Sequence, residues 1–312
     1  MIIFIPYLRY VSVAFALKIF SYNSITRKIY RKIANKFGQN RHSIVTDTEI
    51  NRGLWLYNII INSGLSLNGH TKILELGTGW IHFYGIFLRH LIDSKFILFD
   101  IQDNRQWQAL KIKFNELQEQ LSTMKLYSLD NNKARKIISA VAGKVSKARN
   151  FEDLYLSLGI DYIIEKEGSL GKFNDNEFDI IFSVDVFEHI NSDSLKDTID
   201  NIHRILKPGG LSIHQIGLDD HLTHYSPKMS SKQYLSYSDN IWELLFENRL
   251  QYFNRKQTPE YICLFPNQIF ELIKYETDND AHIENLKIHP QYNHFNADVL
   301  QSERAYIVHK KK

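Results

Sequence analysis

Five short apolar segments that resemble strands alternate with helix-like segments between residues 71 and 217. The strand-like segments are TKILELG, KFILFD, DYIIEKE, FDIIFSVD and LSIHQIG, at residues 71–77, 95–100, 161–167, 178–185 and 211–217. Nearly continuous apolar runs of this length are typical of strands that are buried on both faces of a sheet. Strands alternating with helices predict a parallel sheet covered by helices on both faces, so the expected fold class is α/β.

Acidic residues occur where these strands end. The first strand runs into Glu75-Leu-Gly-Thr-Gly, the second ends at Asp100, the third carries Glu165 and Glu167, and the fourth ends at Asp185. Ligands of open parallel sheets bind outside the carboxyl ends of the strands. We therefore expect these acids to surround one binding site.

The glycine turn after the first strand distinguishes between two kinds of ligand. Gly77 and Gly79 allow a sharp turn and a close approach of the backbone to a ligand, and Asp100 follows at about the 20-residue spacing of a carboxylate that binds a ribose. A dinucleotide would require a third glycine and no carboxylate beside its pyrophosphate, but Ile81-His82 stand at that position. S-adenosylmethionine is a cation without phosphate, so the acids would attract it, and we expect this ligand.

Four sequence blocks resemble those of the class I S-adenosylmethionine-dependent methyltransferases, and in particular the bacterial type 11-like enzymes. The blocks are ELGTG, LFD, FDIIFSVDVFEHI and RILKPGGLSI, and they occur in the family's order between residues 70 and 217. The resemblance implies a doubly wound, mostly parallel sheet of seven strands, the Rossmann-like methyltransferase fold, with S-adenosyl-L-methionine as cofactor. IFELIKYETD and RAYIVHKK, at residues 269–278 and 304–311, would supply the antiparallel hairpin that completes the sheet.

The resemblance also implies roles for individual residues. The glutamate and glycines of the first block would hold the methionine end of the cofactor, and Asp100 would bind the ribose. Glu167 stands where the family usually has an aspartate that contacts the adenine amino group, and Asp185 opens the block that closes over the cofactor. The predicted cofactor-binding residues are Glu75, Gly77, Thr78, Gly79, Asp100, Glu167 and Asp185.

The parts outside the strand–helix alternation predict an extension and two insertions. We expect a helical extension at residues 1–45 and a methyltransferase domain at 46–312, with a helical insertion at about 102–160 and a lid after the fifth strand at about 218–270. The first twenty residues are strongly apolar, but Arg9 and Lys18 interrupt them, which disfavours a membrane span. The pattern favours a helix that packs on its own domain, with peripheral attachment to an anionic membrane through residues 1–40 as the alternative.

Composition excludes several partners. The formal net charge of +3 is too balanced to favour a nucleic acid as partner. The single cysteine, Cys263, rules out an intramolecular disulfide and a cysteine-based metal cluster, which suits a reducing, cytoplasmic location.

Four residues are candidates for a catalytic role, three as bases that remove a proton from the methyl acceptor and one as a residue that orients a base. His189, His214 and His221 are candidate bases, since histidine titrates near neutral pH, and Asp220 could orient His221. A structural role remains the alternative for each of them. His214, Asp220, His221 and His224 could also ligate a divalent ion, but their spacing matches no metal motif, and we predict no metal.

The expected function is S-adenosylmethionine-dependent methylation. The leading hypothesis is O-methylation of a saccharide or another hydroxylated small molecule. The segment after the fifth strand is similar to a subset of bacterial enzymes assigned to cell-surface glycan or secondary-metabolite pathways. The alternatives are an NAD-dependent oxidoreductase or epimerase, and a catalytically silent scaffold with the methyltransferase fold at a membrane surface.

Overall fold

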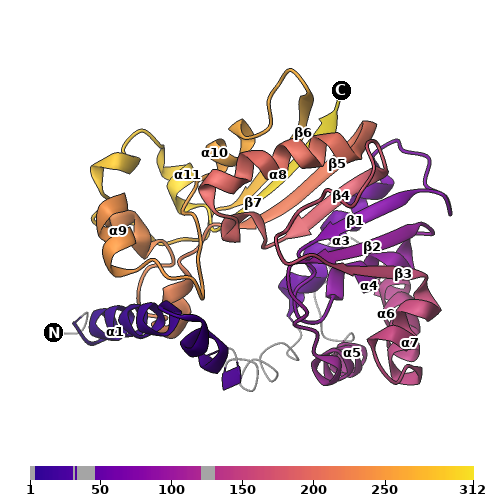
Figure 1. Cartoon of the computed structure of the whole chain (residues 1–312), viewed down its shortest axis with the longest axis horizontal. Coiled ribbons are helices and arrows are strands. Elements are labelled where there is room, and N and C mark those ends of the chain that lie inside the picture. The colour runs from indigo at the N-terminus through magenta and orange to yellow at the C-terminus, as the bar shows by residue number, and fades with distance from the viewer. Residues whose placement is uncertain (1–3, 31, 34–45, 121–130) are drawn as a thin grey trace. The chain divides into compact units, whose positions relative to one another are not determined.

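A computed structural model describes the chain apart from residues 1–3, 31, 34–45 and 121–130 (Figure 1). The predicted boundary at residue 45, and parts of the predicted extension and helical insertion, lie outside the described residues. Contacts divide the chain into two compact units. Unit 1 comprises Met1–Ile33, Val184–His203 and His214–Lys312, and unit 2 comprises Ala34–Ser183 and Arg204–Ile213.

Seven strands form one mixed sheet in the order β3-β2-β1-β4-β5-β7-β6. They are β1 (Lys72–Leu76), β2 (Lys95–Asp100), β3 (Ile160–Ile164), β4 (Phe178–Val184), β5 (Leu206–Gly217), β6 (Phe270–Asp278) and β7 (Arg304–Lys311). β1 pairs in parallel with β2 and β4, β2 pairs in parallel with β3, and β6 and β7 form an antiparallel pair. The predicted seven-stranded Rossmann-like fold and its closing hairpin are confirmed.

Helices connect the strands. The longer ones are α1 (Phe4–Ser21), α3 (Asp47–Ile61), α4 (Phe83–Leu91), α5 (Trp107–Gln120), α6 (Asn131–Lys147), α7 (Phe151–Leu158) and α8 (Ser192–Ile205). Shorter helical segments are η1 (Phe187–His189), η2 (His221–Tyr225), η3 (Gln233–Ser236), α9 (Asp239–Leu245), α10 (Thr258–Cys263), η4 (Pro290–Tyr292) and α11 (Ala297–Gln301).

Unit 2 is built around the apolar residues of β1 and β2. Leu74 in β1 is fully buried and lies in register with Ile97 of β2 and Ile181 of β4. Local signals set the helix ends: the Thr46 side chain accepts the Glu49 backbone N–H at the start of α3, and Gly159 ends α7 with a φ of 64°.

The N-terminal helix α1 packs within unit 1. Tyr10, Ala14 and Leu17 are buried in an aromatic cluster that includes Trp242 and Phe253. Among the described residues, no helix has both the length and the apolar character needed to cross a bilayer. The sequence favoured this packing over a span.

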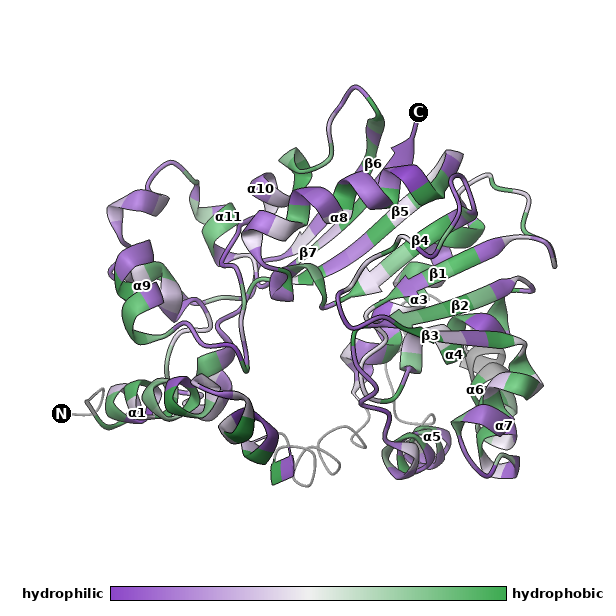
Figure 2. Cartoon of the chain, viewed as in Figure 1, coloured by the Kyte–Doolittle hydropathy of each residue, from purple (hydrophilic) through white to green (hydrophobic). Residues whose placement is uncertain are grey.

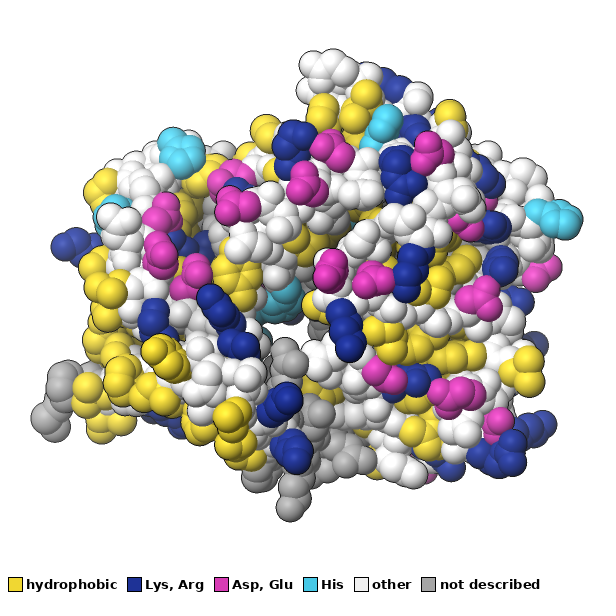
Figure 3. All heavy atoms as spheres, in the orientation of Figure 1, with side chains coloured by type: hydrophobic (Ala, Val, Ile, Leu, Met, Phe, Trp, Pro, Cys, Tyr) yellow, Lys and Arg dark blue, Asp and Glu magenta, His cyan; other side chains and the backbone are white. Residues whose placement is uncertain are grey.

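The opposite side of α1 is exposed and apolar. Ile5 is 73% exposed and Phe15 is 65% exposed, and Leu8 and Ile19 are exposed beside them. Figure 2 shows apolar residues recurring along α1, and Figure 3 shows apolar side chains on the surface of this part of the chain. α1 is therefore apolar on two sides, and unit 1 covers only the side that carries Tyr10, Ala14 and Leu17.

Candidate functional site

The turn between β1 and α4 depends on two glycines. Gly77 and Gly79 have φ values of 68° and 72°, in the left-handed region that side chains with a Cβ avoid. The Gly77 N–H donates to the Phe99 carbonyl oxygen over 2.8 Å, which ties the turn to β2. No described atom lies within 4 Å of where a Cβ on Gly79 would stand, so there is open space beside the turn.

Asp100 holds this turn with its carboxylate. Its Oδ2 accepts the Gly79 N–H at 2.9 Å, and its Oδ1 accepts the Gln102 N–H at 3.2 Å. Burial raises the pKa of Asp100, while the hydrogen bonds from Gly79 and Gln102 act to lower it. The structure therefore brings together the glycine turn and the acid that the strand order had placed at one edge of the sheet.

Glu75 is buried at the end of β1. Its side chain is 2% exposed, and desolvation, with a smaller contribution from Asp100, raises its pKa to about 8. Within the described part of the chain, Oε2 of Glu75 and Oγ1 of Thr78 are both buried without a hydrogen-bond partner. Such atoms normally find a partner, so both are suited to bind a polar ligand.

His82 is a residue of this turn whose role the sequence did not reveal. It is fully buried, has a φ of 52° and precedes α4 as its N-cap residue. Its Nδ1 lies 2.5 Å from the Tyr155 hydroxyl, and its ring packs against Phe151 and Tyr162. Burial and the Arg105 charge lower its pKa to about 3, so the ring is neutral at physiological pH. The one sequence signal that pointed to this position is that Ile81-His82 stand where a dinucleotide site would have its third glycine.

The remaining predicted cofactor residues lie at other places. Glu167 is exposed in the turn after β3, and its neighbour Glu165 forms an ion pair with Lys172 at 2.8 Å. The Glu165 N–H donates to the Asp100 carbonyl oxygen at 3.0 Å, so this turn adjoins the end of β2. Asp185 belongs to unit 1, where its N–H donates to the Gln215 carbonyl oxygen at 2.9 Å.

The three predicted catalytic histidines all lie in unit 1, but in different environments. The rings of His189, which is exposed, and His221, which is half-buried, lie 5.0 Å apart. Burial, followed by the nearby His189, lowers the pKa of His221 to about 4. His214 is fully buried against Phe187 and Phe265, and burial holds its pKa well below the usual value. His214 therefore packs as a core residue.

The carboxylate–histidine pair that the structure forms differs from the expected pair of Asp220 and His221. Asp220 accepts the Tyr10 hydroxyl at 2.6 Å and the Leu222 N–H at 3.0 Å, and burial raises its pKa to about 7. Asp219 instead lies 2.9 Å from Nε2 of His224. In this structure Asp220 caps η2 and joins it to α1, and the histidine oriented by a carboxylate is His224.

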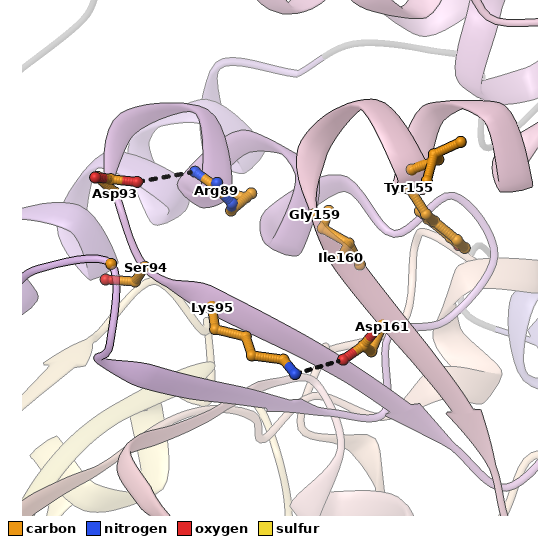
Figure 4. Close-up of a pocket in the computed structure, with 10 residues that line it drawn as sticks. Arg89, Asp93, Ser94, Lys95, Tyr155, Gly159, Ile160 and Asp161 are labelled. Atoms are coloured by element: carbon orange, nitrogen blue, oxygen red, sulfur yellow. Dashed lines mark ion pairs between the residues drawn. The ribbon is translucent and has the colours of Figure 1, made fainter.

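A separate pocket of about 440 Å³ lies at the amino ends of β2 and β3 in unit 2 (Figure 4). Two ion pairs line it, Arg89 with Asp93 at 3.9 Å and Lys95 with Asp161 at 3.1 Å. Ligands of open α/β sheets bind at the carboxyl ends of the strands, so we do not assign this pocket to the cofactor.

The geometry agrees with a comparison of the sequence to known families. Residues 115–214, which include β3 and β4, match the family described as "Methyltransferase domain". The seven-stranded sheet with its antiparallel hairpin is the one that the resemblance implies. The match over these residues supports an S-adenosylmethionine-dependent methyltransferase of class I. S-adenosyl-L-methionine is the cofactor of this methyltransferase.

Comparisons with whole proteins are more distant. No curated protein matches the methyltransferase in a sequence search. Similar solved structures include a Galdieria sulphuraria protein assigned as a sarcosine dimethylglycine methyltransferase, with 14% identity, 84% of this chain and 85% of that chain covered and a TM-score of 0.46. An S-adenosylmethionine-dependent methyltransferase from Mesorhizobium loti has 10% identity, coverage of 81% and 96% and a TM-score of 0.43. The [4+2]-cyclase SpnF has 13% identity, coverage of 82% and 79% and a TM-score of 0.43. Since different chemistries share folds, these similarities do not identify the acceptor.

Proposed function

We propose that Glu75, Gly77, Thr78, Gly79 and Asp100 bind S-adenosylmethionine, with Glu167, in the same unit, as a further contact. The observation that carries the proposal is the hydrogen bond from the Gly79 N–H to the Asp100 carboxylate, which fixes an acid beside the open turn. The buried Oε2 of Glu75 suits an ammonium group, since a cation stabilises a buried carboxylate. When bound, S-adenosylmethionine supplies an electrophilic methyl group.

Glu75 should lose a proton when the cofactor binds. Its pKa of about 8 keeps most of the carboxyl protonated at pH 7 in the free protein, and an adjacent ammonium group would lower that pKa. We expect up to about one proton to be released for each S-adenosylhomocysteine bound at pH 7, and the affinity to rise between about pH 6 and pH 8. Calorimetry in buffers with different ionisation enthalpies measures this proton release directly.

Glu75→Gln provides the matched control for this proton. Glutamine has nearly the same shape but cannot ionise, so the proton release and the rise of affinity with pH should both disappear. Proton release that is unchanged in Glu75→Gln would show that another group carries it.

We further propose that the methyl acceptor is a hydroxyl group, on a saccharide or another small molecule. His189 and His221 lie close together with access to the surface of unit 1, whereas His214 and Asp220 are buried. We therefore assign handling of the acceptor proton to the His189–His221 cluster, next to the Asp219–His224 pair. Removal of this proton by a positioned group typically accelerates a reaction by about 10²–10⁴-fold.

An untargeted comparison tests this acceptor class. Extracts of cells with and without the gene would be incubated with the purified methyltransferase and S-adenosylmethionine carrying an isotopically labelled methyl group. We expect label in a hydroxylated small molecule or glycan that differs by one methyl group between the two cell types. Label in an amine, a carbon centre or a macromolecule such as nucleic acid would contradict the proposal.

We further propose that the protein acts in the cytoplasm and touches a membrane surface, and the exposed face of α1 supports the membrane contact. Ile5, Leu8, Phe15 and Ile19 form an apolar surface, and the exposed bases Arg9, Lys28 and Lys32 lie in the same N-terminal segment. Apolar residues together with basic ones are the features of helices that lie on anionic membranes.

Vesicle flotation tests this membrane contact. We expect the full chain to float with vesicles of phosphatidylserine and phosphatidylcholine and to bind less in high salt, because screening weakens the attraction to the anionic surface. Phe15→Asp with Ile19→Asp should abolish flotation, since both side chains are exposed and their loss leaves the core intact. Leu156→Asp, at a side chain 87% exposed in unit 2, is the control and should float normally. If neither the wild type nor the control floats with the vesicles, the proposal is overturned.

A further inference from the structure

We infer that Glu188, His189 and His221 form a binding site for one divalent transition-metal ion, such as Zn²⁺, Mn²⁺ or Fe²⁺. One potential ligand atom from each residue lies within 4.8 Å of the other two. All three residues belong to unit 1, the first two in η1 and the third at the start of η2. This inference differs from the sequence-based prediction of no metal. Of the residues that the sequence offered as possible ligands, only His221 belongs to the proposed site.

The donor set and its spacing suit such an ion. Two imidazoles and one carboxylate form the ligand set that leaves open positions on a metal for a substrate. Ligand bonds of about 2.0–2.2 Å place two atoms on the same ion within about 4 Å of each other. Small rotations of the exposed His189 and half-buried His221 side chains would close the remaining gap.

The surroundings of His189 and Glu188 orient them as metal ligands are usually oriented. Nδ1 of His189 lies 2.7 Å from the Tyr252 carbonyl oxygen, which leaves Nε2 to face an ion. Oε1 of Glu188 accepts the Gly217 N–H at 3.0 Å. Metal-binding histidines commonly donate their other ring N–H to a backbone carbonyl, and metal-binding carboxylates are commonly hydrogen-bonded in turn.

The turn that carries both ligands is also fixed in place. Nδ2 of Asn254 donates to the carbonyl oxygens of Phe187 and Ile190, at 2.8 and 3.1 Å, on either side of the two ligands. The Tyr261 hydroxyl donates to Oδ1 of Asn254 at 2.6 Å, which holds the amide in this orientation. Sites whose supporting groups are fixed in this way bind ions with less rearrangement.

Acidic residues around the three ligands favour a cation. Asp185 and Asp219 both lie close enough to His221 to act on its charge. His224, bound to Asp219, has its ring 5.7 Å from that of His221. If the proposed function holds, an ion here would bind the acceptor's hydroxyl oxygen and lower its pKa, which deepens the role assigned to the His189–His221 cluster.

Metal binding can be measured without any acceptor. The full chain, purified without a histidine tag and treated with a chelator, would be titrated with Zn²⁺ and Mn²⁺ by calorimetry and with Co²⁺ by visible absorption. We expect one ion per chain, and at least 100-fold weaker binding in Glu188→Gln and in His221→Ala. His224→Ala is the matched control, because it removes a neighbouring histidine outside the set, and it should bind the ion within about threefold of wild type.

A second variant disturbs the site without removing a ligand. A Cβ on Gly217 would stand 2.7 Å from Oε1 of Glu188, so Gly217→Ala should displace that carboxylate and weaken binding by about 10–100-fold. Wild-type protein that binds no ion, or equal losses in His224→Ala and His221→Ala, would overturn the inference. S-adenosylhomocysteine binding, measured on the same preparation, separates the two proposals: its failure alone rejects the cofactor site, and failure of metal binding alone rejects this inference.

Discussion

Asp100→Ala is expected to weaken the binding of S-adenosylhomocysteine by about 100-fold or more. The Asp100 carboxylate fixes the glycine turn through the Gly79 N–H and is the acid assigned to the ribose. A hydrogen bond to a charged group is worth about 1.5–3 kcal/mol, and about 1.4 kcal/mol corresponds to a tenfold change in affinity. Loss of a ribose contact together with a less ordered turn therefore gives this factor, which isothermal titration calorimetry would measure.

Asp161→Ala is the control for this substitution. Asp161 is also an acid on a strand of unit 2, but it lies in β3 and forms an exposed pair with Lys95 at 3.1 Å. Pairs of this kind contribute little to stability, so the affinity should stay within about twofold of wild type. Equal affinities in Asp100→Ala and wild type would remove Asp100 from the cofactor site.

Gly85→Ala is expected to destabilise the protein by about 1–3 kcal/mol, the usual cost of inserting a methyl group into a packed core. A Cβ at position 85 in α4 would stand 2.3 Å from Oε2 of Glu75 and 2.4 Å from Cδ2 of Leu98. Both neighbours are buried, so either their side chains or the helix must shift within the core. Because Glu75 is displaced, cofactor affinity should fall as well. Chemical denaturation measures the change in the free energy of unfolding.

Gly143→Ala is the matched helical control. Gly143 lies in α6, and no described atom lies within 4 Å of where its Cβ would stand. Alanine is favoured over glycine in helices by about 0.5–1 kcal/mol, so this variant should be more stable than wild type. Destabilisation of the same size in both variants would show that close packing against Glu75 and Leu98 does not explain the effect at Gly85.

The fold and the proximity of Asp100 to the glycine turn could be predicted because both are encoded locally. Mostly apolar segments such as Ile73–Leu76 and Phe96–Phe99 identify strands by themselves, and the strand–helix alternation restricts how they can be ordered. The glycine turn lies within one short segment, and the parallel register of β1 and β2 brings Asp100 beside it. Short-range pattern and sheet topology were sufficient for this part.

The contacts of Asp219 and Asp220 were predicted less well, because they join distant segments. Asp219 and Asp220 are adjacent, and nothing in the sequence shows which of them pairs with a histidine. The Tyr10 hydroxyl, which is 210 residues away, binds Asp220 and so leaves Asp219 for His224. Likewise, the partner of His82 is Tyr155, which is 73 residues away, and the sequence pattern near position 82 showed only a missing glycine.

The binding of S-adenosylhomocysteine to the full chain tests the central claim most directly. Calorimetric titration of protein that shows a cooperative thermal unfolding transition should give one S-adenosylhomocysteine per chain, and parallel titration with NAD should give no binding. Saturable binding of NAD, or folded protein that binds no S-adenosylhomocysteine, would contradict the assignment of Glu75, the glycine turn and Asp100 to a sulfonium cofactor.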